Sequence, residues 1–338
     1  ASLDLRDKEG QARAVLEVGR DGRPALRLLG ADGGRRAAVE VAADGAAALS
    51  LAGADGTTRL ALAVPEVGTA DLSLRAPDGR SRLALSVRPD GGSTLGLKDR
   101  DGKVRLALSQ EPDGRTSLRL KDRGDADRFR LALPPSGATD LSLRDQDGRP
   151  RLALAVAADG AAALDVRDAE GQSRLVVGAE PSGRPALDLR DPQGRPRIIL
   201  ADEADGRPTL DLRDEEGHPR LVLGVEPNGT TGLGLRDQNG TIRLGLSTAP
   251  DGATALGFRD HNGKPRLGMS SGADGATALG FRDRDGKPRL VLISQPDGTT
   301  GVSLQDPDGK TRLTLVTSAD GTPALHLLDK NGKPQPLR

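Results

Sequence analysis

Arginine recurs at a fixed interval along this chain, and it is the residue type best placed to do chemistry. It appears once every 23 residues, in fourteen of fifteen successive segments. A ladder of guanidinium groups at constant pitch suits an anionic polymer such as an acidic polysaccharide. The members we expect to bind such a polymer are Arg220, Arg243, Arg266 and Arg289. The alternative is that each arginine pairs with a nearby aspartate, and the equal numbers of basic and acidic residues, 49 of each, favour that pairing.

Aspartate-rich segments such as Asp-Gln-Asn-Gly at 237–240 and Asp-Pro-Asp-Gly at 306–309 resemble fragments of calcium loops. A calcium site needs six to eight oxygen ligands, whereas each segment offers two such side chains and no distal glutamate. We therefore expect these aspartates to bond turn amides. His218, His261 and His326 lie far apart in the sequence, and no serine has a histidine at a repeated offset. The sequence predicts no catalytic site, no metal site and no cofactor.

Composition limits the partners of the chain. The 338 residues carry no net charge, and Phe129, Phe258 and Phe281 are the only aromatic residues. A nucleic-acid-binding surface would need net basicity and aromatic side chains, so we expect no nucleic-acid partner. No apolar run approaches the roughly 18 residues of a membrane-spanning helix. Electrical neutrality instead favours self-association, so other copies of the chain are the expected partners.

Two interleaved series of glycines set the organisation of the chain. The first series has a strict period of 23 residues: Gly22, Gly45, Gly68, Gly91, Gly114, Gly137, Gly160, Gly183, Gly206, Gly229, Gly252, Gly275, Gly298 and Gly321. The second series runs from Gly10 to Gly332 with the same period, except that Asp125 holds one position and glycine has moved to Gly124. Such a period indicates stacked repeats. We predict one elongated array over residues 1–338, with an atypical last repeat at about 322–338.

Each repeat contains two short runs in which leucine alternates with other residues. Around Gly240 the leucines are Leu233, Leu235, Leu244 and Leu246. Alternation at period two predicts β-strands, and a Gly or Pro every six to eight residues leaves no room for a helix. Two architectures fit: a continuous antiparallel meander of about 30 strands, which hairpin-type turn residues favour, and a two-sided β-solenoid.

The leucine spacing also predicts the loops, because a slip of one residue would send every leucine to the opposite face. Around the first series it requires an odd loop, and Pro250-Asp251-Gly252 suits a three-residue type I turn closed by a glycine bulge. Around the second series the leucine spacing requires a loop with an even number of residues. We predict a four-residue loop there, as at 237–240, because proline at the first position of other copies rules out a two-residue type I′ turn.

A single sheet with aliphatic residues along one side cannot remain uncovered in water. We expect Leu233, Leu235, Leu244 and Leu246 to belong to an assembly face covered by further copies. The opposite side carries small residues such as Gly234, Gly257 and Gly280. These form either a plain surface or a face for close lateral packing in a fibre.

The rhythm LxLRDxxGxxRLxL…DGxxxLxLRD resembles the DxxG-turn β-hairpin repeats of many bacterial surface and secreted proteins, and is loosely similar to RHS/YD and MORN repeats. The resemblance implies an extracellular or cell-surface protein. The function we expect is structural, as the subunit of a β-rich fibre or surface filament. The alternatives are an adhesin stalk or polyanion binder that uses the arginine ladder, and an RHS-like β-shell.

Overall fold

The computed structural model describes residues 1–336, and every regular element in that range is a β-strand. The prediction of an all-β chain is therefore confirmed. Contacts divide the chain into two compact units, Ala1–Gly171 and Gln172–Arg338, which are described in turn. The final two residues of the last repeat, for which an atypical end was predicted, lie outside the described residues.

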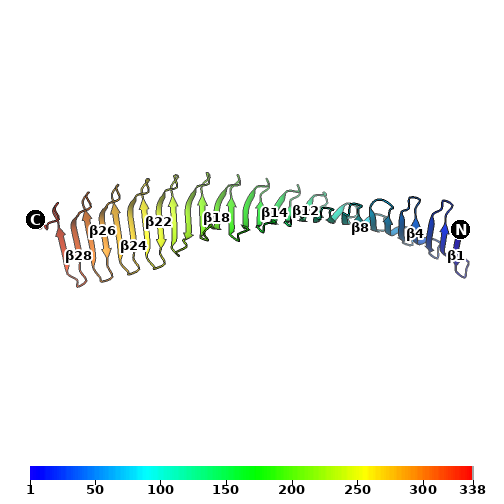
Figure 1. Ribbon diagram of the computed structural model, residues 1–338, viewed down its shortest axis with the longest axis horizontal. Helices are drawn as coiled ribbons and strands as arrows, with labels where there is room; N and C mark the ends of the chain where they lie inside the picture. The colour runs from blue at the N-terminus through cyan, green and yellow to red at the C-terminus, as the bar shows by residue number, and fades with distance from the viewer. Residues whose placement is uncertain (337–338) are drawn as a thin grey trace. The chain divides into compact units, whose positions relative to one another are not determined.

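The first unit contains fifteen strands, which follow one another along the chain (Figure 1). They are β1 (Ser2–Arg6), β2 (Ala12–Val18), β3 (Pro24–Leu29), β4 (Arg35–Val41), β5 (Ala47–Ala52), β6 (Thr58–Val64), β7 (Ala70–Arg75), β8 (Ser81–Val87), β9 (Ser93–Lys98), β10 (Val104–Gln110), β11 (Thr116–Lys121), β12 (Asp127–Leu133), β13 (Thr139–Arg144), β14 (Pro150–Val156) and β15 (Ala162–Arg167).

The second unit contains fourteen strands within its described residues. They are β16 (Ser173–Ala179), β17 (Pro185–Arg190), β18 (Pro196–Asp202), β19 (Pro208–Arg213), β20 (Pro219–Val225), β21 (Thr231–Arg236), β22 (Ile242–Thr248), β23 (Thr254–Arg259), β24 (Pro265–Ser271), β25 (Thr277–Arg282), β26 (Pro288–Ser294), β27 (Thr300–Gln305), β28 (Thr311–Thr317) and β29 (Pro323–Leu327).

Within each unit, every strand pairs antiparallel with the next strand in the chain. β21 and β22 are typical, with Thr231 opposite Thr248 and Leu235 opposite Leu244. β22 then pairs with β23 in the same way. This connectivity is a meander, as predicted. The alternative β-solenoid is wrong, because it would place parallel strands beside one another.

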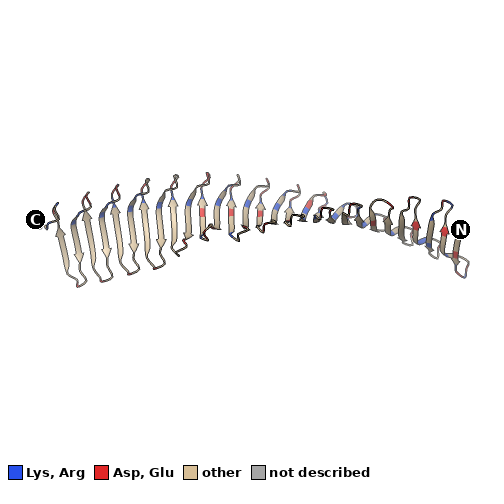
Figure 2. Cartoon of the chain, in the orientation of Figure 1, with Lys and Arg blue, Asp and Glu red and all other residues tan. Residues whose placement is uncertain are grey.

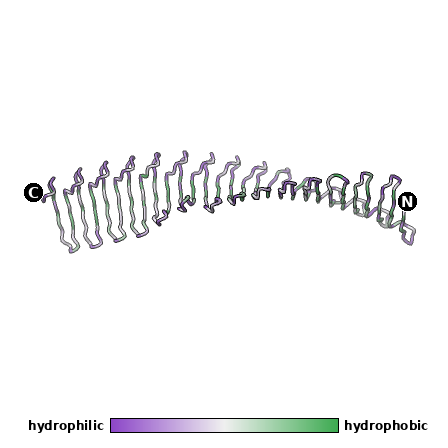
Figure 3. The backbone as a smooth tube through the Cα atoms, viewed as in Figure 1, coloured by the Kyte–Doolittle hydropathy of each residue, from purple (hydrophilic) through white to green (hydrophobic). Residues whose placement is uncertain are grey.

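The leucines at the repeated positions of each unit lie on one face of its sheet, which we call the leucine face. Leu235 opposes Leu244, which in turn opposes Phe258 on the following strand. We call this line of residues, next to the second-series turns, the turn-side row. Leu233 and Leu246 begin a parallel line nearer the first-series turns, the far row. Hydrophobic character therefore follows the strands, while the turns are hydrophilic (Figure 3).

The opposite face, which we call the small face, carries shorter side chains in the second unit. Gly234 opposes Gly245, and Gly257 opposes Gly268. A Cβ atom built on Gly234 or Gly245 would contact Ile242, so this isoleucine leans over the two glycines on the small face. Such a pair of unlike faces follows from the period of two along each strand.

The first-series turn around Gly252 has the predicted three-residue loop. The amide of Ala249 donates to the carbonyl oxygen of Ala253 at 2.7 Å, and the amide of Gly252 donates to that of Ala249 at 2.9 Å. These bonds enclose Pro250, Asp251 and Gly252. Gly252 has a φ of 88°, the left-handed conformation of a glycine bulge. The type I turn with a closing glycine is confirmed.

The second-series turns differ from the prediction of a four-residue loop. The amide of Asp237 donates to the carbonyl oxygen of Thr241 at 3.0 Å, so the loop holds only Gln238, Asn239 and Gly240. The leucine spacing requires one residue more than this three-residue loop contains, and that residue lies in the strand. Arg236 opposes Ile242 and Leu235 opposes Leu244, which leaves Arg243 without an opposite residue, in a β-bulge. The bulge restores the leucines to one face, and the four-residue loop is wrong.

Candidate functional site

The ladder arginines occupy the β-bulges beside the second-series turns. Each of the four predicted members forms an ion pair with the aspartate that opens its own turn. Arg243 Nη1 lies 3.4 Å from Asp237 Oδ2. The other pairs are Arg220–Asp214, Arg266–Asp260 and Arg289–Asp283. The bulge therefore turns each guanidinium back towards the turn from which its strand begins.

The turn aspartate has two functions, one for each carboxylate oxygen. Asp237 Oδ1 accepts hydrogen bonds from the amides of Asn239 at 2.9 Å and Thr241 at 3.1 Å, which closes the turn. Oδ2 accepts from Arg243. Partial removal from solvent raises the pKa of this carboxyl group, but the two amides and the guanidinium lower it further, so its pKa lies below the ordinary value.

Three second-series turns open with glycine or alanine, and there the carboxylate comes from a different position. Arg36 pairs with Asp32 at 2.6 Å, and Arg82 pairs with Asp78 at 2.7 Å. Arg59 pairs with Asp55 at 2.8 Å in the same way. In each case the aspartate lies four residues before the arginine, where the other turns have it six residues before. The ion pair is thus retained although the first turn residue has changed.

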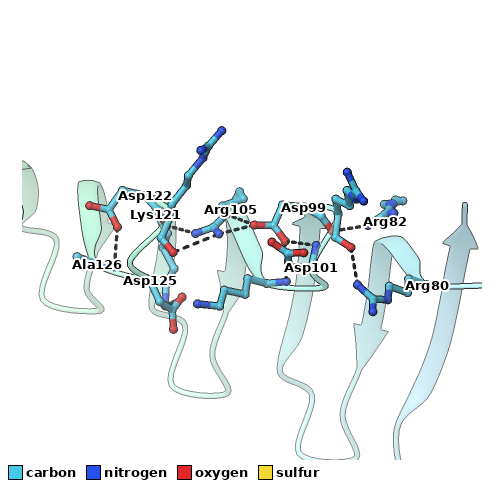
Figure 4. A network of polar contacts seen from close by, with 12 residues as sticks. Arg80, Arg82, Asp99, Asp101, Arg105, Lys121, Asp122, Asp125 and Ala126 are labelled. Atoms are coloured by element: carbon cyan, nitrogen blue, oxygen red, sulfur yellow. Dashed lines mark hydrogen bonds and ion pairs between the residues drawn. The ribbon is translucent and has the colours of Figure 1, made fainter. Parts of the chain in front are cut away.

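The same arginines also connect successive repeats. Arg243 Nε donates to the carbonyl oxygen of Arg259, in the following repeat, at 2.9 Å. Arg128 Nε donates to the carbonyl oxygen of Arg144 at 2.8 Å. Arg82 and Arg105 make the corresponding bonds to Asp99 and Asp122, as the close view shows (Figure 4). We call this line of turn aspartates, bulge arginines and next-repeat carbonyls the arginine seam.

The arginine seam leaves little free positive charge for an anionic polymer. Every ladder arginine named in the prediction has a carboxylate partner in its own turn, and basic and acidic residues gather together near the strand ends (Figure 2). A polyanion would have to compete with those carboxylates. The geometry therefore favours the interpretation of the ladder as internal Arg–Asp pairing.

A second arginine position supports the turns on the small face. Arg236 Nη1 donates to the carbonyl oxygen of Gly240 at 3.0 Å, and Arg282 Nη1 donates to that of Gly286 at 3.0 Å. The acceptor belongs to the turn glycine four residues later. The motif Arg-Asp-x-x-Gly therefore contains the donor, the turn-closing carboxylate and the glycine of a single turn.

One turn gathers three groups that could ligate a metal ion. Ligand atoms of Asp214, Glu216 and His218 lie within 4.8 Å of one another. This group was not predicted, although the Asp-x-Glu-x-His spacing within one turn is a signal for it in the sequence. Asp214 already accepts from the amides of Glu216 at 3.1 Å and His218 at 2.9 Å, and it also pairs with Arg220. The arrangement is an ordinary seam turn with two additional exposed side chains.

The predicted assembly residues share the leucine face but differ in exposure. Leu233 and Leu244 are half-buried by their neighbours, whereas Leu235 is 37% exposed and Leu246 is 45% exposed. No side chain in the described residues is both large and fully buried. A chain of this length normally has a buried core, formed where two apolar layers pack together. The leucine face is one such layer, and no second layer covers it among the described residues.

The accessible area of the chain leads to the same conclusion. It is 20567 Å² for a mass of 35.1 kDa. Two globular proteins of half this mass would together expose about 16,000 Å². The excess is several thousand Å², whereas a stable interface buries about 800 Å² on each partner. The surface is therefore large enough for extensive association.

The small face of the second unit is hollowed where its side chains are short. A groove of about 640 Å³ includes Gly234, Gly245, Gly257 and Gly268 in its lining, with Arg259 among the residues around it. On the leucine face a shallower depression of about 530 Å³ is lined by residues that include Leu246 and Met269. The described residues form no helix long and apolar enough to cross a membrane.

Comparison with known proteins gives structural neighbours only. No protein-family model matches the chain, and no curated protein matches it. A variant of the TCP10 domain of Danio rerio CPAP superposes at a TM-score of 0.28 and 15% identity, over 64% of this chain and 95% of the domain. The TCP domain of Drosophila melanogaster SAS-4, solved with a proline-rich motif of Ana2, gives a TM-score of 0.30 and 15% identity, over 48% of this chain and 88% of that domain. Similarity at this level assigns the chain to no family.

Proposed function

We propose that this protein is structural and forms a β-rich fibre or filament by association with further copies of itself. The observation that carries the proposal is the leucine face. Leu235 and Leu246 are 37% and 45% exposed within an apolar layer, in which Leu235 opposes Leu244 and Leu233 opposes Leu246 on the next strand. Hydrophobic area of this extent is stabilised only when another apolar surface covers it.

A second copy is the partner whose pattern matches. The leucine rows repeat at the spacing of paired strands, about 4.8 Å, and a covering surface needs the same spacing to interdigitate. The chain carries no net charge, so long-range repulsion between copies is small. The arginine seam supports this function by fixing each hairpin to the next, which keeps the rows in line.

We further propose an extracellular or cell-surface location, which rests on the resemblance of the turn motif to repeats in bacterial surface and secreted proteins. Treating intact cells with a protease that cannot cross membranes tests this part separately. A surface protein is degraded under these conditions, whereas a protein that survives until the cells are lysed lies inside.

Negative-stain electron microscopy of the purified protein tests the structural function. Filaments or rods are expected for the wild type. A variant with Leu233, Leu235, Leu244 and Leu246 replaced by serine should give fewer and shorter particles, because part of the leucine face is then polar. Compact single particles of the wild type at high concentration would contradict the proposal.

A further inference from the structure

Two arginines lie side by side on the small face of the first unit. The central line of that face, which we call the middle row, runs through opposed residues from Asp4 on β1 to Asp165 on β15. Most of its members are alanine, serine or glycine. Arg119 on β11 and Arg130 on β12 interrupt the middle row and lie directly opposite each other. Like charges at opposed positions of an antiparallel pair repel, so the two arginines destabilise their own hairpin.

These two arginines differ from the other charged residues of the middle row. The others each form an ion pair, and the pairs are Arg27–Glu17, Arg27–Glu40, Asp4–Arg6 and Asp165–Arg167. Among the described residues, no carboxylate forms an ion pair with Arg119 or Arg130. The Nε atoms of both are buried and have no hydrogen-bond partner there. A buried donor without an acceptor costs free energy, which an added acceptor removes.

Both side chains lie against the sheet. Ser117 and Ala132, which adjoin the arginines on the same two strands, are 3% and 5% exposed. Ser142, which opposes Arg130 on β13, is 2% exposed. Residues this small are buried on an open sheet only where the stems of longer side chains cover them. The two arginines themselves remain partly exposed, so their outer guanidinium atoms can reach a ligand.

The carboxylates near the pair leave a positive charge. Asp127 holds the place in its repeat that Ile242 holds in a later one, and Ile242 leans over the two glycines that correspond to the arginines. Asp127 Oδ1 is buried and has no hydrogen-bond partner in the described chain. Asp140 on β13 is exposed, where solvent screens its charge. The hairpin at 116–133 has five basic and three acidic side chains, so it carries a net positive charge.

We infer that Arg119 and Arg130 together bind a small tetrahedral oxyanion, phosphate or sulfate, on the small face of the first unit. Each guanidinium group is a planar fork of N–H donors, and a tetrahedral oxyanion has enough oxygen atoms to accept from both forks at once. The bound anion removes the repulsion between the arginines and supplies the acceptors that they lack. The site is separate from the arginine seam, and it does not depend on self-association.

The neighbours of the pair limit the size of the ligand. Ala107 and Ser142 flank the two arginines in the middle row, and Ala153 follows. None of these side chains is charged, so the row offers one binding position for an anionic group. A polymer of such groups gains little over a single anion here. The ligand is therefore small, in contrast to the polyanion expected for an arginine ladder.

Amide hydrogen exchange of β11–β13 in phosphate, in sulfate and in chloride at one ionic strength tests the site. A ligand that binds only the folded hairpin slows exchange through local opening about tenfold when its concentration is ten times its dissociation constant. We expect a saturable slowing of this size in phosphate and in sulfate, confined to these strands. Equal exchange in the three salts would overturn the inference. Equal slowing along the whole chain would do so as well, because it reports a general effect of the salt on stability.

The next repeat supplies residues for matched variants. Arg119→Ser and Arg130→Ala together copy Ser142 and Ala153, which hold the same places 23 residues later, so the sheet accommodates both changes. This double variant should lose the response to phosphate. Arg27→Ser is the control, because it removes an arginine of the same row that already has carboxylate partners, and it should keep the response. A response that survives in the double variant, or that disappears in the control, would contradict the site.

Asp127→Asn tests the carboxylate beside the pair. It removes the charge that competes with the anion, so phosphate should bind this variant several times more tightly than the wild type. If Asp127 instead pairs with both arginines in solution, the wild type will show no response to phosphate and this variant will gain one. That result would overturn the inference for the wild-type chain.

Discussion

Arg243 Nε donates to the carbonyl oxygen of Arg259 at 2.9 Å, across the boundary between two consecutive repeats. The donor lies in a β-bulge and the acceptor ends the strand before the next second-series turn. Since Arg243 also pairs with Asp237 of its own turn, one side chain connects a turn, a bulge and the following repeat. The arginine seam is therefore the device that holds neighbouring hairpins in register.

Replacing Arg243 with alanine should loosen the sheet locally. The change removes a charge-assisted hydrogen bond and leaves the Arg259 carbonyl oxygen to solvent, so we expect a loss of about 1 kcal/mol in the free energy of local opening. Amide hydrogen exchange of β22–β24 measures that loss. Arg284→Ala is the matched control, since Arg284 is 90% exposed and its nearest carboxylate lies 4.0 Å away. Equal effects of the two variants would mean that the seam bond contributes nothing.

Asp125 should be a weak point that glycine can repair. It is the only non-glycine residue of the described chain with a positive φ, 72°, because glycine has moved to Gly124 in this turn. A left-handed conformation costs a non-glycine residue about 1 kcal/mol, so Asp125→Gly should stabilise its hairpin by that amount. Gly148→Asp, at the equivalent position one repeat later, should destabilise its own hairpin by a similar amount. Hydrogen exchange of β11–β14 reports both effects, and a destabilising Asp125→Gly would contradict the assignment of strain.

Acid should weaken the seam turns together. The pKa values of Asp237, Asp260 and Asp283 lie below the ordinary carboxyl value, because amide and arginine hydrogen bonds outweigh the opposing effect of partial burial. A carboxyl group with a lowered pKa contributes its full stability above its unfolded-state pKa, about 3.9. That contribution is lost as the pH falls through the folded-state pKa. Urea unfolding midpoints should thus be level near neutral pH and fall below about pH 4.

Replacing these three aspartates with asparagine tests the cause of the acid effect. The amide oxygen can still accept the turn hydrogen bonds, but the charge that titrates is gone. The variant should be less stable at neutral pH and should depend less on pH below 4. If its pH dependence equals that of the wild type, other carboxyl groups cause the acid sensitivity.

The strands and the loop at 250–252 could be predicted from the sequence, because neighbouring residues determine both. Leucines at a spacing of two predict strands, and Pro250-Asp251-Gly252 predicts the three-residue loop that the structure has. The loop at 237–240 was mispredicted for a specific reason. The leucine positions require one additional residue between the two strands, but this count does not say whether it lies in the loop or in the strand. The structure places it in the strand, at Arg243.

The function of the arginines could not be decided from composition. Both interpretations of the ladder, a polyanion site and Arg–Asp pairs, require arginine at a regular pitch. The bulge decides between them, because it brings Arg243 back to Asp237. The shift of the carboxylate from the first turn position to Asp32, Asp55 and Asp78 is visible in the sequence, but its meaning depends on the same bulge.

The leucine face should be necessary for association, and the small face should not. Val222→Ser, Val291→Ser and Ile293→Ser together form a matched control, because they remove aliphatic side chains from the small face, where Val222 opposes Gly234 and Val291 opposes Gly280. We expect this variant to associate as the wild type does. Serine at Leu233, Leu235, Leu244 and Leu246 should weaken association at least tenfold, because apolar area is lost from the covered surface.

Sedimentation equilibrium of the wild-type protein over a wide concentration range is the most direct measurement. If a second copy covers the leucine face, the measured mass will be a multiple of the 35.1 kDa chain and will fall towards that value on dilution. A folded β-sheet protein that keeps the mass of one chain at every concentration would contradict the account.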